Sequence, residues 1–185
     1  MDEAVLVMQA RDGDQRAFAD LVNAHRNQIW AVCLQICGNR HDAEDALQAT
    51  LLAAWRNLDK FRGEARFSTW MHRIAANNAL ALIRKRKANT TLTDFSDPEA
   101  PVTLDADDSA PRFDEQIALR DQLREALQQL SDDIREAVVL REFGDFSYAD
   151  IAEHQGVGVQ TVKSRLNRGR TQLAQYLRAH TTVDS

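Results

Sequence analysis

Apolar residues recur every third or fourth position through most of this chain, which predicts an all-α protein. Between Asp14 and Cys37 they fall at Phe18, Leu21, Val22, Ile29, Val32, Cys33 and Ile36. The same spacing recurs over residues 39–58, 68–87, 119–130, 132–143 and 159–176. A shorter helix is expected between residues 147 and 156. The aromatic content of 6% and the presence of only three prolines also argue against an all-β fold.

Residues 88–113 interrupt this pattern. They contain Pro98, Pro101 and Pro111, many Asp, Ser and Thr residues, and no hydrophobic period. A segment of this composition cannot bury enough apolar surface to fold alone, so we expect a flexible acidic linker. The chain is therefore predicted to form two small helical domains, residues 1–87 and 114–185.

Capping residues support several of the predicted helix ends. Asn39 and Ser131 can each cap the helix that follows, because their side-chain oxygens can accept from free backbone N–H groups. Ser147 and Asp150 have the spacing of a capping box. Gly156 then tolerates the left-handed conformation of a tight turn.

The clearest functional pattern is a helix-turn-helix over residues 147–173. The small Ala152 allows two helices to cross closely, and the next helix would turn Val159, Val162 and Leu166 inward. Its outward positions are polar: Gln160, Thr161, Lys163, Ser164, Asn167 and Arg168. Such side chains can bind base edges and phosphates in a major groove. The alternative is an ordinary solvated helix face, which the capping and spacing make less favourable.

A second pattern lies in residues 62–87, where seven basic residues face one acid. Basic residues interleaved with Phe67 and Trp70 suit single-stranded nucleic acid, because bases stack on aromatic rings. Phe67, Trp70 and Ile74 also have the spacing of a helix core, so packing remains an alternative. The run Arg84–Lys87 is typical of a helix end that binds phosphate.

Charge separates these basic segments from the rest of the chain. The net charge is −5, yet residues 62–87 and 157–185 each carry an excess of positive charge. An acidic remainder repels a long polyanion, so we expect the isolated protein to bind DNA weakly and to need another molecule to hold it there.

Two further groups of residues suggest metal or redox chemistry and are better explained otherwise. Cys33 and Cys37 lie on one helix face, but no second Cys or His pair has matching spacing, so core packing is favoured over a thiol sensor. His41 and Asp45 could begin a hydrolase metal site, but an acidic first helical turn explains them more simply. We predict no catalytic residue, no metal and no cofactor.

The composition also limits the location. No apolar run approaches the ~20 residues that cross a bilayer. The run Ala4–Met8 lacks the basic flank of a signal peptide. We therefore expect a cytoplasmic protein without membrane insertion.

Two long motifs resemble extracytoplasmic-function (ECF) sigma factors of bacterial RNA polymerase. Residues 41–55, HDAEDALQATLLAAW, and 61–87, FRGEARFSTWMHRIAANNALALIRKRK, are similar to the second region of that family. Residues 130–173, LSDDIREAVVLREFGDFSYADIAEHQGVGVQTVKSRLNRGRTQL, are similar to its fourth region. His154 and Gln155 stand where the family often has apolar residues.

The resemblance implies a role for each motif. The protein would bind core RNA polymerase and direct promoter-specific initiation, reading two promoter elements and aiding melting. The first motif would dock on the β′ coiled coil through Asp42, Asp45, Gln48 and Leu52. The second would take the −10 element through Arg62, Gly63, Phe67, Trp70, Asn77, Arg84, Lys85, Arg86 and Lys87.

The helix-turn-helix would read the −35 element, and its domain would also meet the β flap. The matching positions are Gln160, Thr161, Lys163, Ser164, Arg165, Asn167 and Arg168. The resemblance further implies an anti-sigma factor as a regulatory partner. A dimeric helix-turn-helix regulator is a rival interpretation, but residues 1–87 show neither a ligand-pocket nor a phosphoacceptor pattern.

Overall fold

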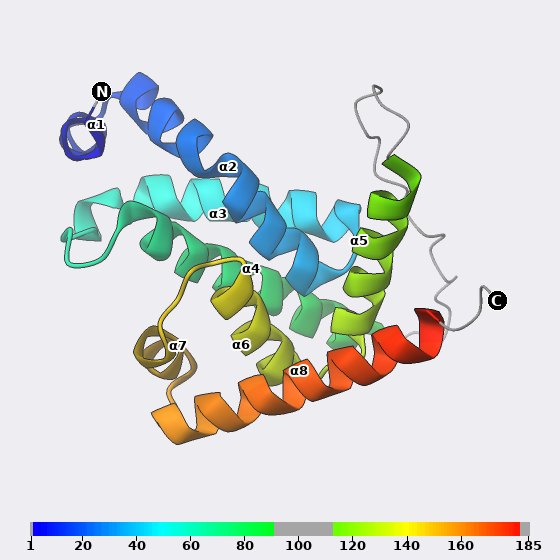
Figure 1. Ribbon diagram of the computed structural model, residues 1–185. Helices are drawn as coiled ribbons and strands as arrows, with labels where there is room; N and C mark the ends of the chain where they lie inside the picture. Colours follow the sequence, from blue (N-terminus) through cyan, green and yellow to red (C-terminus); the bar gives the residue numbers. More distant parts are fainter. Residues whose placement is uncertain (1, 91–112, 182–185) are drawn as a thin grey trace.

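The computed structural model describes residues 2–90 and 113–181, and its regular elements there are all helical (Figure 1). The first group, which we call the N-terminal bundle, comprises α1 (Glu3–Arg11), α2 (Gln15–Cys37), α3 (Arg40–Arg56), the short 3₁₀ helix η1 (Leu58–Lys60) and α4 (Phe67–Thr90). The second, the C-terminal bundle, comprises α5 (Phe113–Gln128), α6 (Asp132–Glu142), α7 (Tyr148–Gln155) and α8 (Val159–Thr181). The predicted all-α class is confirmed. The expected linker lies largely outside the described residues.

Several helix ends follow the local signals in the sequence. The Asn39 side chain accepts from the backbone N–H of Asp42 at 2.8 Å, as a cap of α3. Ser147 and Asp150 form the expected capping box of α7, and Gly156 has φ 64° in the left-handed region. These predictions are confirmed.

Other local expectations were met only in part. Ser131 is the N-cap residue of α6, as expected, but its side chain makes no capping bond, and the first turn carries the acidic Asp132 and Asp133 that the helix dipole favours. The helix α1, capped by Asp2, was not expected. Leu119 was expected in the apolar stripe of its helix but is 60% exposed, because it lies on α5 beyond the part of this helix that the other elements cover.

The N-terminal bundle is built around α2, α3 and α4, which all contact one another. Ile29, Val32 and Ile36 of α2 are fully buried. The facing positions of the other two helices are small, which lets their axes approach closely. These buried residues are Ala43, Ala46, Ala54, Ala75, Ala76 and Ala79.

The C-terminal bundle depends on a close crossing of α6 and α8. Gly169 of α8 is buried at this crossing, and a Cβ atom there would lie 2.6 Å from Val138 Cγ2 and 2.9 Å from Ile134 Cγ2. Glycine therefore allows the two helices to pack, and any larger residue would push them apart.

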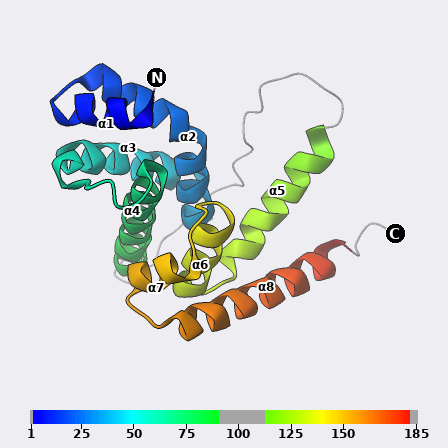
Figure 2. The same ribbon diagram turned by 60° about the vertical axis from the view of Figure 1, so that its left-hand side comes forward.

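The two bundles also pack against each other, since α6 contacts both α2 and α4 (Figure 2). The buried apolar residues of both bundles form one continuous cluster. We expected two domains separated by a tether, and the sequence contained no sign of this packing. Within the described ranges, no helix is long and apolar enough to cross a membrane.

Candidate nucleic-acid interface

The helix-turn-helix is formed by α7, the turn at Gly156 and α8. Ile151 of α7 and Val162 and Leu166 of α8 are buried against the rest of the bundle. This packing fixes the direction in which the opposite face of α8 points. Val159 was predicted to turn inward, but it is 40% exposed because it is the first residue of the helix, before the contact with α6.

The predicted −35 residues lie on the exposed face of α8, with one exception. Six are exposed: Gln160, Thr161, Lys163, Ser164, Asn167 and Arg168. Arg165 is half-buried and is held inside the bundle, donating from Nη1 to Gln155 Oε1 at 2.7 Å and from Nη2 to Asp133 Oδ2 at 3.2 Å. Arg165 therefore also contributes to the packing of the C-terminal bundle.

His154 and Gln155 belong to the same polar network. His154 Nε2 lies 2.7 Å from Glu136 Oε1, with both side chains almost fully buried. Gln155 Nε2 donates to the other oxygen of Glu136 at 2.8 Å. A buried carboxylate is costly unless its oxygens are paired. His154 and Gln155 therefore join α7 to α6 and α8 through hydrogen bonds to Glu136 and Arg165, at positions where the family often has apolar residues.

The predicted −10 residues are divided between surface and core. Arg62, Gly63 and Asn77 are exposed on α4 and the loop before it. Arg84 and Lys85 are exposed near the end of α4. A strand of DNA could therefore reach basic groups at both ends of this helix.

The aromatic members of the −10 set pack into a cluster. Phe67 is 1% exposed, with its ring centroid 5.7 Å from that of Phe61 and 5.8 Å from that of Trp70. Trp70 is half-buried. Phe67 is therefore a core residue in this structure, whereas Trp70 is partly exposed at the surface.

Two basic residues at the end of α4 are engaged within the protein. Arg86 Nη1 donates to Asp42 Oδ2, and Lys87 Nζ donates to Asp132 Oδ1 at 2.8 Å. They remain largely exposed, so these partners do not bury them.

The predicted polymerase-binding residues share one side of α3, except Asp42. Asp45 and Gln48 are exposed, and Leu52 is 57% exposed, which is unusual for a large apolar side chain. Asp42 is only 7% exposed and also accepts from Asn39 Nδ2 at 2.8 Å. In this structure Asp42 therefore joins α3 to α4, and its role in polymerase binding stays a prediction.

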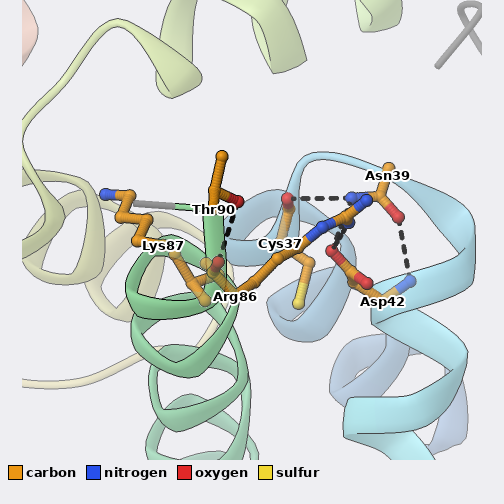
Figure 3. Close-up of a pocket in the computed structure, with 7 residues that line it drawn as sticks. Cys37, Asn39, Asp42, Arg86, Lys87 and Thr90 are labelled. Atoms are coloured by element: carbon orange, nitrogen blue, oxygen red, sulfur yellow. Dashed lines mark hydrogen bonds and ion pairs between the residues drawn. The ribbon is translucent and has the colours of Figure 1, made fainter. Parts of the chain in front are cut away.

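A cavity of about 540 Å³ lies beside this ion pair, between the α2–α3 turn and the end of α4 (Figure 3). In Figure 3 Arg86 extends across the cavity to Asp42, and Asn39 bonds the same carboxylate. The lining residues are Cys37, Asn39, Asp42, Ile83, Arg86, Lys87 and Thr90. Because Arg86 and Asp42 bind one another and Lys87 binds Asp132, we assign no ligand to this cavity.

The cysteines and the His41 cluster have ordinary structural environments. Burial raises the pKa of Cys33 to about 12 and also raises the pKa of Cys37. Both thiols therefore stay protonated near neutral pH, which favours core packing over redox sensing. His41 and Asp45 are exposed and 3.8 Å apart, and the described part of the chain has no cluster of three or more metal-ligating side chains.

Comparison with known families and sequences agrees with this geometry. Residues 21–89 match the model of Sigma-70 region 2, and residues 120–173 match that of Sigma-70 region 4. The chain is 34% identical over 182 residues to the ECF RNA polymerase sigma factor SigW of Bacillus subtilis, covering 93% of this chain and 95% of SigW. It is 33% identical over 171 residues to the RNA polymerase sigma-H factor of Pseudomonas aeruginosa, covering 89% and 88% of the two chains.

Solved structures give the same relationship. CnrH in complex with the cytosolic domain of CnrY aligns with a TM-score of 0.67 and 27% identity, over 99% of both chains. The sigma factor RpoE of Bartonella quintana, in complex with the anti-sigma factor NepR, aligns with a TM-score of 0.72 and 27% identity, over 91% of this chain and 98% of that one.

Proposed function

The chain belongs to the ECF RNA polymerase sigma factors, and we propose how its residues divide the work of that family. A sigma factor is not an enzyme: it binds core RNA polymerase and directs the complex to a promoter. In our proposal, residues 1–87 act as the region 2 domain, residues 114–185 act as the region 4 domain, and residues 88–113 link them.

We assign −35 recognition to the exposed face of α8. The observation that carries this assignment is the set of six exposed polar and basic side chains on a helix whose other face is buried by Val162 and Leu166. A helix presented in this way can enter a major groove and donate to base edges and phosphates. Among these six residues, Arg168 has a long cationic side chain that can reach either a base edge or a phosphate.

We assign −10 binding to the loop before α4 and the exposed basic residues of α4. Arg62 and Asn77 would contact the backbone and bases of the melted strand, Trp70 would stack on a base, and Arg84 and Lys85 would bind phosphate. Asp45, Gln48 and Leu52 would form the polymerase contact on α3. These surfaces face different partners, as an initiation factor requires.

Regulation by an anti-sigma factor is part of the proposal. The solved structures of CnrH and RpoE that align with this chain each contain a second protein, CnrY or the anti-sigma factor NepR. A protein of this kind would cover polymerase-binding surfaces. Because the polymerase and its template are cytoplasmic, we place the chain there too.

Run-off transcription with purified core polymerase on fragmented genomic DNA, followed by mapping of the start sites, tests the proposal. Addition of the chain should produce discrete transcripts that core polymerase alone does not make. Footprinting of a mapped promoter should show protection with the complex and much weaker protection with the chain alone. Equal protection with and without core polymerase would contradict the assignment.

A further inference from the structure

A series of hydrogen bonds connects the three helices that form and support the helix-turn-helix. It begins at the buried pair of His154 and Glu136, continues through Gln155, and ends at Arg165 and Asp133. The helices α6, α7 and α8, which supply these residues, all contact one another. Since Arg165 is one of the predicted −35 residues, the series leads from the interior of the bundle to the proposed DNA-binding face.

Glu136 determines which way the side-chain amide of Gln155 points. The side chains of His154 and Glu136 are 5% and 7% exposed, and His154 Nε2 lies 2.7 Å from Glu136 Oε1. Because a carboxylate accepts hydrogen bonds, Gln155 turns its donor Nε2 toward the other oxygen, Glu136 Oε2, at 2.8 Å. The same Nε2 donates to the backbone carbonyl of Asp133 at 2.9 Å. With Nε2 held by α6, the amide oxygen Oε1 is directed toward α8.

Gln155 and Asp133 together hold the guanidinium of Arg165. Arg165 Nη1 donates to Gln155 Oε1 at 2.7 Å, and Arg165 Nη2 donates to Asp133 Oδ2 at 3.2 Å. A guanidinium only donates, so the amide orientation set by Glu136 is the one that Arg165 requires. A planar group held at both terminal nitrogens has a defined direction. The rotational freedom of this side chain is therefore reduced before any ligand binds.

Arg165 lies at the edge of the exposed face of α8. Thr161 and Arg168, one helical turn before and one turn after it, lie on the same side of the helix and are exposed. The Arg165 side chain is 21% exposed, and a guanidinium carries more N–H donors than the two bonds to Gln155 and Asp133 use. A phosphate or base edge that meets Thr161 and Arg168 is therefore also close to the remaining donors of Arg165.

We propose that Gln155 and Asp133 are positioning residues that direct Arg165 toward the −35 element, and that Glu136 orients Gln155. The inference rests on the proposed function of α8 in −35 binding. An arginine that the protein already holds loses less side-chain freedom when it binds DNA than a free one does. Gln155 stands where the family often has an apolar residue, and an apolar side chain has no oxygen to accept from Arg165.

The alternative is that these hydrogen bonds only stabilise the C-terminal bundle. A double-mutant cycle separates the two roles, because it measures whether the effect of one side chain depends on the presence of another. The cycle compares the native chain, Gln155→Leu, Arg165→Ala and the double variant, each bound to core polymerase. The measurement is the apparent affinity of each complex for a promoter mapped by run-off transcription, at one salt concentration because phosphate contacts depend on salt.

Gln155→Leu should weaken promoter binding roughly three- to tenfold in the chain that retains Arg165. In the chain that carries Arg165→Ala, the same change should alter the affinity by about twofold or less, because no guanidinium is left to position. Gln122→Leu is the matched control: Gln122 is half-buried like Gln155 but lies on α5. This control should leave the affinity unchanged with and without Arg165.

Asp133→Ala provides a second cycle, which does not depend on whether Gln155→Leu folds. The Asp133 side chain is 58% exposed, and its removal leaves the hydrogen bonds of Glu136 in place. Loss of a negative charge near DNA favours binding with and without Arg165, and the cycle subtracts this common effect. The remaining difference should again be a loss of affinity that requires Arg165.

Each result decides the inference. Equal effects with and without Arg165 overturn it and assign these side chains to packing alone. Tighter binding by Gln155→Leu only where Arg165 is present also overturns it, because the guanidinium would then be held away from DNA. A promoter with an altered −35 element checks the proposed function in the same assay. If the native complex binds both promoters equally, both proposals fail, whereas −35 dependence with equal effects in the cycles contradicts the positioning role alone.

Discussion

The two DNA-binding surfaces proposed for this chain differ in how far function and structure share residues. On α8, six of the seven −35 residues are exposed, and buried Val162 and Leu166 support them from the opposite face. On α4 and its preceding loop, the −10 set includes exposed Arg62 and Asn77 but also the fully buried Phe67. The −35 residues therefore lie on the outer face of a helix whose opposite face packs. The −10 set, by contrast, includes a residue of the hydrophobic core.

This difference changes what a substitution means in each place. A side chain on the outer face of α8 can be removed without loss of packing, so a functional defect there reports on DNA. A substitution in the aromatic cluster of α4 changes the stability of the N-terminal bundle as well. Transcription alone therefore cannot assign the −10 residues, and unfolding must be measured beside it.

Phe67→Ala should give the largest effect and tests this contrast directly. Removing a fully buried phenylalanine creates a cavity, and we expect a loss of about 3–5 kcal/mol in the free energy of unfolding, measured by urea denaturation. Arg62→Ala, on the exposed loop, should leave the unfolding curve unchanged within about 0.5 kcal/mol. A stable Phe67→Ala protein that fails only in promoter opening would assign this ring to DNA instead.

Gly169→Ala tests whether the packed face of α8 contributes to stability as strongly as the aromatic cluster of α4 does. The new methyl group would overlap the side chains of Val138 and Ile134, so we expect a loss of about 1–3 kcal/mol in the free energy of unfolding. Gly158→Ala is the control, because no atom lies within 4 Å of the added Cβ and its φ is not in the left-handed region. Equal stability of the two variants would show that the helices can shift apart at no cost.

Arg168→Ala tests the exposed face of α8, where we expect a loss of function without a loss of stability. Loss of one groove contact is expected to weaken −35-dependent transcription by about tenfold, equivalent to about 1.4 kcal/mol, with stability and core polymerase binding unchanged. Gln172→Ala, exposed further along α8, is the control for helix propensity. If polymerase binding falls as much as transcription, the side chain belongs to a protein contact and not to the groove.

The smallest expected effect is a pH dependence of the packing between the bundles. Burial lowers the pKa of His72 from its usual 6.5, opposed by its bond to Gly144 and by Asp145, and His25 lowers it further. Protonation would also place a proton on Nε2, which has no hydrogen-bond partner among the described residues. His72 therefore favours the packed state fully above pH 6.5, and this contribution falls as the pH drops below that value.

Energy transfer between dyes on Asp20→Cys of α2 and Gln175→Cys of α8, both exposed positions, checks this dependence when measured between pH 7.5 and 5.5. The free chain should open on acidification, by up to about tenfold in the open fraction for each unit by which the pKa is lowered. His72→Gln, which cannot titrate, should remove the dependence that this histidine causes. The charged groups that lie closest, Arg73, Asp145 and His25, remain in that variant, so an unchanged pH profile would attribute the response to them.

Much of the local structure was predictable because it depends on residues close together in the chain. Helical spacing predicted the all-α class, and Asn39, Ser147 and Asp150 marked two helix starts correctly. The helix-turn-helix and the exposed face of α8 followed from the position of Val162 and Leu166 relative to polar neighbours. Motif similarity identified the family, which the comparisons confirm.

The tertiary structure decided every question that depends on which helix faces which. Asp42 became a buried partner of Arg86, Arg165 was tied to Asp133, and Gly169 became the contact point of two helices. The packing of the bundles joins residues more than 70 positions apart, such as His72 and Gly144. A side chain's pattern along its own helix shows which way it turns, but only the fold determines whether water, a carboxylate or another helix lies there.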